Sequence, residues 1–196
     1  LLACAIYAET LESFPCLVGH CRPIMVNGWL RRTAAQADNH AGRTMDPSHP
    51  TATLDPLSRP LLPIRRFSEL RGGEKYPLAA RTITHAHFSA FQALTGDNHP
   101  IHYDREYCRA LGHPDLLAHG LHVLSLTAAG AGLFPHVVGP HLIGFTEVSA
   151  KFLRGVFPDD TIYPMLEITA LKPQRTTGIV VMAATLENQR GERVLE

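Results

Sequence analysis

One segment, residues 116–134, combines helical periodicity with many small residues, and it limits the possible folds more than any other part of the chain. Leucines recur at the spacing of one helix face, at Leu117, Leu121 and Leu124. Alanine and glycine occupy many of the other positions. Such residues weaken a helix that is exposed to solvent, but they suit a helix that a sheet encloses closely. We therefore expect a long buried helix here, ended by Pro135.

Most of the chain after this helix is typical of β-strands. Apolar and polar residues alternate over 143–153 and again over 162–170, and 178–186 is more continuously apolar. The predicted strands are 78–83, 143–153, 162–170, 178–186 and 192–196. Turn residues separate them, including FPDD at 157–160 and NQRG at 188–191. The order of strand, helices, long helix and antiparallel strands predicts an α+β fold in which a sheet curls around a helix.

Residues 1–63 do not resemble the rest. The part from 31 to 60 is rich in Pro, Asp, Ser and Thr and has few large apolar residues, so it cannot bury enough surface to offset the entropy of ordering. We expect a disordered or linker-like leader over 1–63 and one domain over 64–196 that lacks part of its last strand. One hypothesis is that residues upstream of Met45 are not native. Mass spectrometry of the natural N-terminus tests this.

Composition excludes several classes of protein. Basic and acidic residues balance at 18 each, which predicts no binding of nucleic acid or of an anionic membrane surface. No apolar run approaches the roughly 20 residues that a membrane span needs. The opening LLACAIYA lacks the basic region of a signal peptide. We therefore expect a cytoplasmic protein with reduced thiols. Cys16, His20 and Cys21 have metal-binding chemistry, but no second pair of ligands follows, so no metal site is expected.

The segment GDNHPIHYD, residues 96–104, gathers acid and base side chains around Pro100. Asp97, His99 and His102 lie within a stretch that glycine and proline keep from being an ordinary helix. Loops that a rigid scaffold positions often carry function. We therefore expect a built site here, although a polar loop that joins two helices would have the same composition.

Two short helices are predicted on either side of this segment. Thr84 is a candidate N-cap for the first, which carries apolar residues at helical spacing and ends at Gly96. Asp104 is a candidate N-cap for the second, REYCRAL, which Gly112 closes. The role predicted for Asp104 is therefore structural.

The motifs between 67 and 196, taken in order, resemble the MaoC-like hydratases and dehydratases, a family of hot-dog fold that includes the (R)-specific enoyl-CoA hydratases. TGDNHPIHYD at 95–104 is similar to the family's hydratase motif, and AHGL at 118–121 is similar to the start of its central helix. KFLRGVFPDDTIY at 151–163 is similar to its strand and turn. The resemblance implies a single hot-dog domain, in which an antiparallel sheet wraps around a long central helix.

The resemblance also implies roles for particular residues. Asp97 and His102 correspond to the catalytic pair, and the backbone N–H of Gly120 corresponds to the donor that binds the thioester carbonyl. The residues expected to bind substrate are His99, Pro100 and His119. The chain departs from the family at two places. His99 stands where asparagine is usual, and Ala128 stands where many members have a serine that contacts the catalytic aspartate.

The implied function is that of a hydro-lyase acting on a 2-enoyl or 3-hydroxyacyl thioester of CoA or acyl-carrier protein. No further cofactor is expected, and the single hot-dog unit implies a homodimer. The residue types suit this chemistry, because hydration needs a positioned water, a base for its proton and an acid for C2. An N–H at a helix N-terminus can stabilise the thioester oxygen without a metal.

Three alternatives remain open from the sequence. The first is a mesaconyl-type hydratase of branched or dicarboxylic acyl-CoA, which Arg or His side chains in the acyl pocket would favour. The second is a hot-dog thioesterase, which would lack the spacing between Asp97 and His102. The third is a non-catalytic subunit that binds acyl thioesters, and the presence of both residues argues against it.

Overall fold

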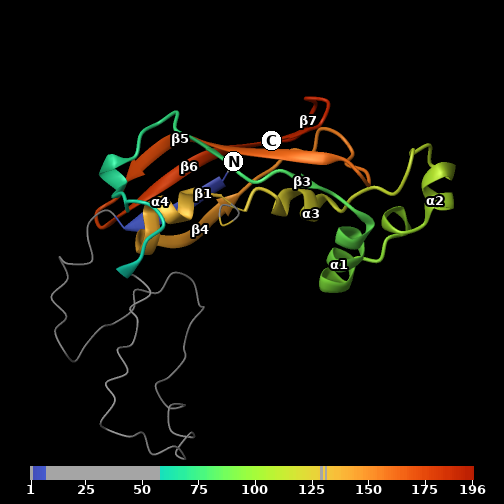
Figure 1. Cartoon of the computed structure of the whole chain (residues 1–196), viewed down its shortest axis with the longest axis horizontal. Coiled ribbons are helices and arrows are strands. Elements are labelled where there is room, and N and C mark those ends of the chain that lie inside the picture. The colour runs from blue at the N-terminus through green and yellow to red at the C-terminus, as the bar shows by residue number, and fades with distance from the viewer. Residues whose placement is uncertain (1, 8–57, 129, 131) are drawn as a thin grey trace, which may run out of the picture. The chain divides into compact units, whose positions relative to one another are not determined.

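The computed structural model describes residues 2–7, 58–128, 130 and 132–196. The chain divides into two units, of which the first spans 1–10 and 60–196. The first unit carries the sheet and helices (Figure 1). The strands are β1 (Leu2–Tyr7), β2 (Lys75–Pro77), β3 (Arg81–Thr82), β4 (Leu142–Val148), β5 (Thr161–Pro173), β6 (Thr177–Asn188) and β7 (Arg193–Leu195). The α-helices are α1 (His85–Thr95), α2 (Arg105–Ala110), α3 (Gly120–Ser125) and α4 (Phe134–Val138), and 3-10 turns span Phe67–Glu69, Pro100–His102 and Gly139–His141.

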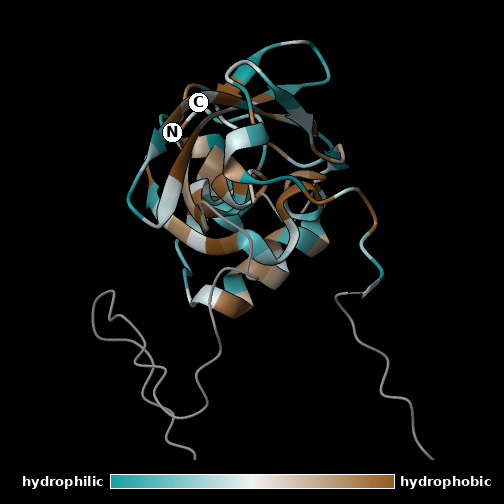
Figure 2. Cartoon of the chain, turned by 90° about the vertical axis from the view of Figure 1, so that its left-hand side faces the viewer, coloured by the Kyte–Doolittle hydropathy of each residue, from teal (hydrophilic) through white to brown (hydrophobic). Residues whose placement is uncertain are grey.

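The strands form one antiparallel sheet in the order β2-β5-β6-β1-β4, with β3 also paired to β5 and β7 to β6. Its centre is the long β5–β6 hairpin, in which Leu166 faces Ala184 across the ladder. Figure 2 shows the strands curving around part of the helical segments, whereas Figure 1 shows α1 and α2 toward one end of the sheet. The predicted α+β class is therefore confirmed. Among the described residues, no helix is long and apolar enough to cross a membrane.

Residues 2–7 lie inside this sheet, which corrects the expectation that they belong to a leader. The strand β1 pairs with β6 on one side and with β4 on the other. The side chains of Leu2, Cys4 and Ile6 are buried in the core that α4 covers. The partners of this strand lie more than 130 residues away along the chain, at 142–148 and 177–182. The pattern of six apolar residues by itself does not predict this pairing. The rest of the predicted leader up to residue 57, including Cys16, His20 and Cys21, lies outside the described residues.

The continuous helix predicted over 116–134 is also corrected. The structure forms two short helices instead, α3 and α4, and Pro135 lies in the first turn of α4 rather than at the end of a helix. Proline is well tolerated in a first helical turn because the N–H that it lacks would have no partner there. Residues 116–118 lie outside any helix or strand, and the amides of Leu117 and Ala118 donate to the carbonyls of Ile101 and Val156.

The domain has two clusters of buried apolar residues. One lies between α4 and the strands β1, β5 and β6, around Phe134 and Ile168. The other joins α1 and α3 to the opposite ends of β5, β6 and β7, around Phe88 and Leu186. The second cluster supports the segment 96–104, because Ile101 packs against it.

The turn at 157–160 anchors this second cluster through Asp160, which is buried. Its carboxylate accepts hydrogen bonds from the Phe157 amide at 3.0 Å, from Gln189 Nε2 at 2.8 Å and from Arg190 at 3.3 Å. We expect Asp160→Asn to lower the free energy of unfolding by about 2 kcal/mol, because an amide group cannot accept all three bonds. Urea unfolding followed by circular dichroism measures this. Asp159→Asn, the same change at the exposed neighbouring position, is the control, and equal losses in both variants would contradict the prediction.

Candidate active site

The loop between α1 and α2 places the candidate acid and base. The helix α1 begins after Thr84, as predicted, and ends at Gly96, whose φ of 71° is left-handed and therefore favours glycine. Asp97 follows directly, and its amide donates to Thr95 Oγ1. Asp104 caps α2 by accepting a hydrogen bond from the Tyr107 amide at 3.0 Å. The predicted helix ends and caps are thus confirmed. They fix the two ends of the loop that carries Asp97 and His102.

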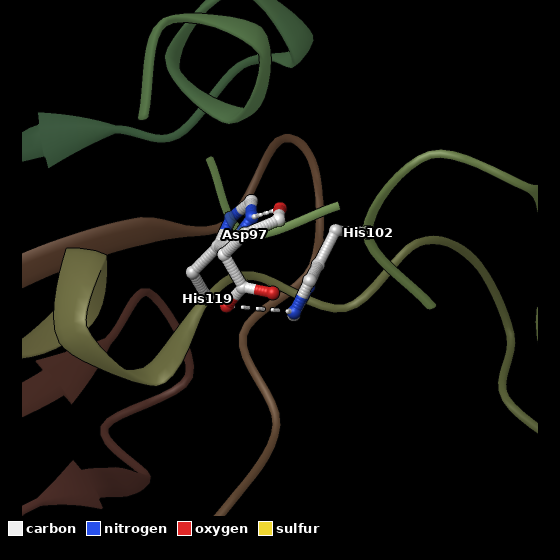
Figure 3. Close-up of side chains that lie close together, drawn as sticks. All are labelled: Asp97, His102 and His119. Carbon is white, nitrogen blue, oxygen red and sulfur yellow. Dashed lines mark hydrogen bonds and ion pairs between the residues drawn. The ribbon is translucent and has the colours of Figure 1, made fainter. Parts of the chain in front are cut away.

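Asp97 and His102 lie side by side (Figure 3). Asp97 Oδ2 is 3.9 Å from His102 Nε2, which is too long for a direct hydrogen bond. The aspartate side chain is 52% exposed, whereas that of His102 is 11% exposed. The fold therefore brings these two side chains together, as their spacing in the sequence predicted.

The orientation of His102 is set by a backbone group. Its Nδ1 lies 2.6 Å from the Leu117 carbonyl oxygen, which can only accept, so Nδ1 carries the proton. In the neutral ring Nε2 then has a free lone pair, directed toward Asp97. Burial lowers the pKa of His102 below its ordinary value, so the neutral form predominates at pH 7. Sequence reasoning missed Leu117, because a backbone acceptor leaves no side-chain signal.

His119 lies beneath this pair and is 1% exposed. Its ring stacks on that of His102 at a centroid distance of 3.7 Å, and its Nε2–H donates to the Asp97 carbonyl at 3.2 Å. His119 therefore contacts both members of the pair and holds them together. His99 lies on the exposed side, where it accepts a hydrogen bond from the Ile101 amide. Substrate contact by His99, Pro100 and His119 stays a prediction.

A pocket of about 350 Å³ opens beside His102. Its lining includes His102, Leu117, Gly120, Val123, Phe152 and Arg154. Gly120 opens α3, so its N–H has no acceptor within the helix. A Cβ at this position would lie 3.3 Å from the Phe152 ring, so glycine suits this tight approach. Ala128, where a serine was noted in the family, is exposed.

Known proteins share this fold. A sequence model of the family described as "MaoC like domain" matches residues 69–190, more than half of the chain. The chain belongs to the MaoC-like family. Its sheet around short helices is a single hot-dog domain, as the resemblance implied.

Three similar proteins illustrate the relationship. The chain is 31% identical over 128 residues to the peroxisomal hydratase-dehydrogenase-epimerase of Saccharomyces cerevisiae, a match that covers 65% of this chain but 13% of the yeast protein. The structure of the monoamine oxidase regulatory protein from Archaeoglobus fulgidus superimposes with a TM-score of 0.62 at 31% identity, covering 68% of this chain and 89% of that one. The R-hydratase PhaJ1 from Pseudomonas aeruginosa gives a TM-score of 0.55 at 28% identity, covering 66% and 79%.

In this MaoC-like domain the acid–base cluster also contains metal-binding atom types. Ligand atoms of Asp97, His102 and His119 all lie within 4.8 Å of one another. The planes of the two stacked imidazoles are only 21° apart, so an ion that touched both rings would lie out of both planes. Because an imidazole nitrogen directs its lone pair within the ring plane, this arrangement suits proton transfer better than metal coordination.

A second buried histidine makes the stability of the domain depend on pH. Burial lowers the pKa of His122 to about 4, and the charges of His87, His119 and Arg81 act in the same direction. Between about pH 6.5 and 4 the unfolded chain therefore binds a proton that the folded chain does not. We expect this residue to remove on the order of 2–3 kcal/mol of stability as the pH falls through that window. Urea unfolding at a series of pH values should show a smaller fall for His122→Gln, and identical slopes would contradict the prediction.

Proposed function

We propose that this chain catalyses the reversible addition of water to a 2-enoyl thioester. The observation that carries the proposal is the gap of 3.9 Å between Asp97 Oδ2 and His102 Nε2. One oxygen atom can lie about 2.8 Å from both atoms, a normal hydrogen-bond distance. A water held there would donate one proton to the imidazole and the other to the carboxylate, with its oxygen directed away from both.

The groups around this water suit the steps of hydration. His102 Nε2 takes a proton as the water oxygen bonds to C3 of the enoyl group, and the carboxylate of Asp97 stabilises the imidazolium that forms. Electrons of the double bond move toward the thioester oxygen, which accepts a hydrogen bond from the Gly120 N–H. The proton on His102 then passes to C2 and gives the 3-hydroxyacyl thioester. Dehydration is the reverse path, and neither direction needs a metal.

The similar proteins support this reaction class. The yeast relative is named as a hydratase-dehydrogenase-epimerase, and the Pseudomonas aeruginosa structure is named as an R-hydratase. The pocket beside His102 has apolar walls at Leu117, Val123 and Phe152, and an acyl thioester would fit such walls. Arg154 lies in the same lining, where its positive charge suits a carrier that bears phosphate, either CoA or acyl-carrier protein.

Crotonyl-CoA tests the proposal with the full chain. A hydratase removes the absorbance of the enoyl thioester and yields a product heavier by one water, which mass spectrometry detects. A thioesterase releases a free thiol instead, which a thiol reagent detects. Binding without either change identifies a non-catalytic subunit, so each rival has its own signal.

The Gly120 N–H gives a separate prediction. Gly120→Pro removes this donor, and proline is compatible with the first position of a helix. We expect a loss of about 10²–10³ in kcat, the usual cost of losing one such donor. Gly120→Ala keeps the N–H and crowds only the Phe152 ring, so its loss should be much smaller. Equal losses in the two variants would show that steric crowding, rather than the donor, is responsible.

Pairing of two copies is also a proposal. Exposed apolar side chains on α3 and β4 support it, at Leu121, Ile143 and Phe145. These side chains would be covered if the two domains of a homodimer met along them. Light scattering after size-exclusion chromatography measures the mass in solution.

A further inference from the structure

A second pocket, of about 370 Å³, lies against α1, α3 and the residues around β3. It is distinct from the pocket beside His102, because it is lined by His122 and Ser125 of α3, whereas the other is lined by Gly120 and Val123. These two pairs of residues point to different sides of the helix. The reaction proposed above uses none of the residues in this second lining.

The lining combines apolar walls with one arginine and two histidine side chains. Phe91 and Leu94 of α1 supply apolar surface, and Arg81, His87 and His122 supply the polar groups. Among the described residues that line it, none is an aspartate or a glutamate. Within the described part of the chain, Arg81 forms no ion pair. Its charge is therefore available to an anion that enters the pocket.

His122 is an unsatisfied polar group in this pocket. The residue is 6% exposed, and its Nδ1 has no hydrogen-bond partner among the described residues. Its ring stacks against those of Phe91 and His87, at centroid distances of 5.4 and 6.0 Å. A buried polar atom without a partner is costly. The wall of the pocket therefore includes a side chain whose Nδ1 is buried and unpaired.

Two successive rings, those of Phe91 and His119, lie between this pocket and His102. Phe91 lines the pocket and also contacts His119 at a centroid distance of 5.2 Å. His119 in turn stacks on His102 at 3.7 Å.

We propose that this second pocket is a carboxylate site, which takes the charged end of a small acid with an apolar body. The guanidinium of Arg81 pairs with the carboxylate, ring N–H groups of His122 and His87 donate hydrogen bonds to its oxygens, and Phe91 and Leu94 cover the carbon chain. Two sources supply such a group: the distal carboxylate of a dicarboxylic enoyl thioester, or a free short-chain acid. The first source rests on the proposed hydratase function, and the second does not.

The first arm of the test compares two substrates of equal carbon count, 2-hexenedioyl-CoA and 2-hexenoyl-CoA, with the full chain. If the substrate carries the carboxylate, Arg81→Gln lowers kcat/KM by about 10–100-fold for the dicarboxylic thioester only, because a charge-assisted hydrogen bond is lost. Arg175→Gln removes the same charge at an exposed turn and leaves both rates unchanged. A wild type that hydrates neither these thioesters nor crotonyl-CoA contradicts the proposed function, and the second arm then decides the carboxylate site.

The second arm measures binding of free hexanoate by NMR, with hexanol as the uncharged control. The ring signals of His122 are identified by their loss in His122→Gln. If the pocket binds a carboxylate, hexanoate shifts these signals in the wild type, hexanol does not, and Arg81→Gln abolishes the shift. A shift without any kinetic preference assigns the site to a free acid. The proposal is overturned if Arg81→Gln leaves both hydration rates unchanged and hexanoate leaves the His122 ring signals unshifted.

Discussion

Asp97→Asn and His102→Ala are each expected to lower hydration of crotonyl-CoA by about 10²–10⁴-fold while the fold is retained, the range for loss of a positioned acid or base. Asparagine keeps the shape of Asp97 but no longer stabilises an imidazolium at 3.9 Å. Alanine at position 102 removes the nitrogen that accepts the proton of water. Loss of enoyl-thioester absorbance under saturating and limiting substrate gives kcat and kcat/KM for each variant.

The control for this prediction comes from the same loop. Asp104→Asn makes the same chemical change seven residues after Asp97, and asparagine caps a helix as well as aspartate does. This variant should hydrate crotonyl-CoA at the wild-type rate. The double variant Asp97→Asn with His102→Ala should be little worse than the worse single variant, because the two residues act on one water. Rates near that of the wild type in either single variant would remove the pair from the mechanism.

A chain that begins at residue 11 is expected to lose its cooperative fold, because it lacks β1. This strand lies between β6 and β4, so its removal leaves backbone groups of both neighbours unpaired. It also removes the buried side chains of Leu2, Cys4 and Ile6 from the core around α4. Burial of each large apolar side chain contributes about 1.5–3 kcal/mol, and a whole domain is stable by only about 5–15 kcal/mol.

A point variant tests the same strand without shortening the chain. Ile6→Ala should lower the free energy of unfolding by about 2–5 kcal/mol, the range for such a truncation in a core, since Ile6 is 0% exposed. Ile143→Ala makes the same change on the neighbouring strand β4, where the side chain is 49% exposed, and should cost much less. Urea unfolding of both variants gives the comparison. A shortened chain with the wild-type unfolding midpoint would show that β1 does not contribute.

Local patterns in the sequence were sufficient to predict the helices and turns around the site. Thr84, Gly96 and Asp104 act within a few residues of their own positions, as caps and as a left-handed helix end. Their effects therefore follow from short-range sterics and hydrogen bonding, which a pattern in the sequence reports directly. The close approach of Asp97 and His102 belongs to the same class, because they are only five positions apart and one proline turn lies between them.

Only the tertiary structure decided the features that depend on distant partners. The strand β1 is selected by pairing with β4 and β6, and no pattern within 2–7 identifies those partners. The predicted long helix is divided into α3 and α4, although the leucine spacing favours one helix throughout.

The chemistry of the site shows the same division. The sequence by itself determined which acid and base side chains share the loop between α1 and α2. The position of the proton on His102 depends on the carbonyl of Leu117, and the position of the His102 ring depends on its stacking against His119. Those contacts join segments 15 and 17 residues apart in the chain. A histidine becomes a directed base only where folding supplies a partner for its second nitrogen and removes water from its ring, and both of these are properties of packing rather than of local sequence.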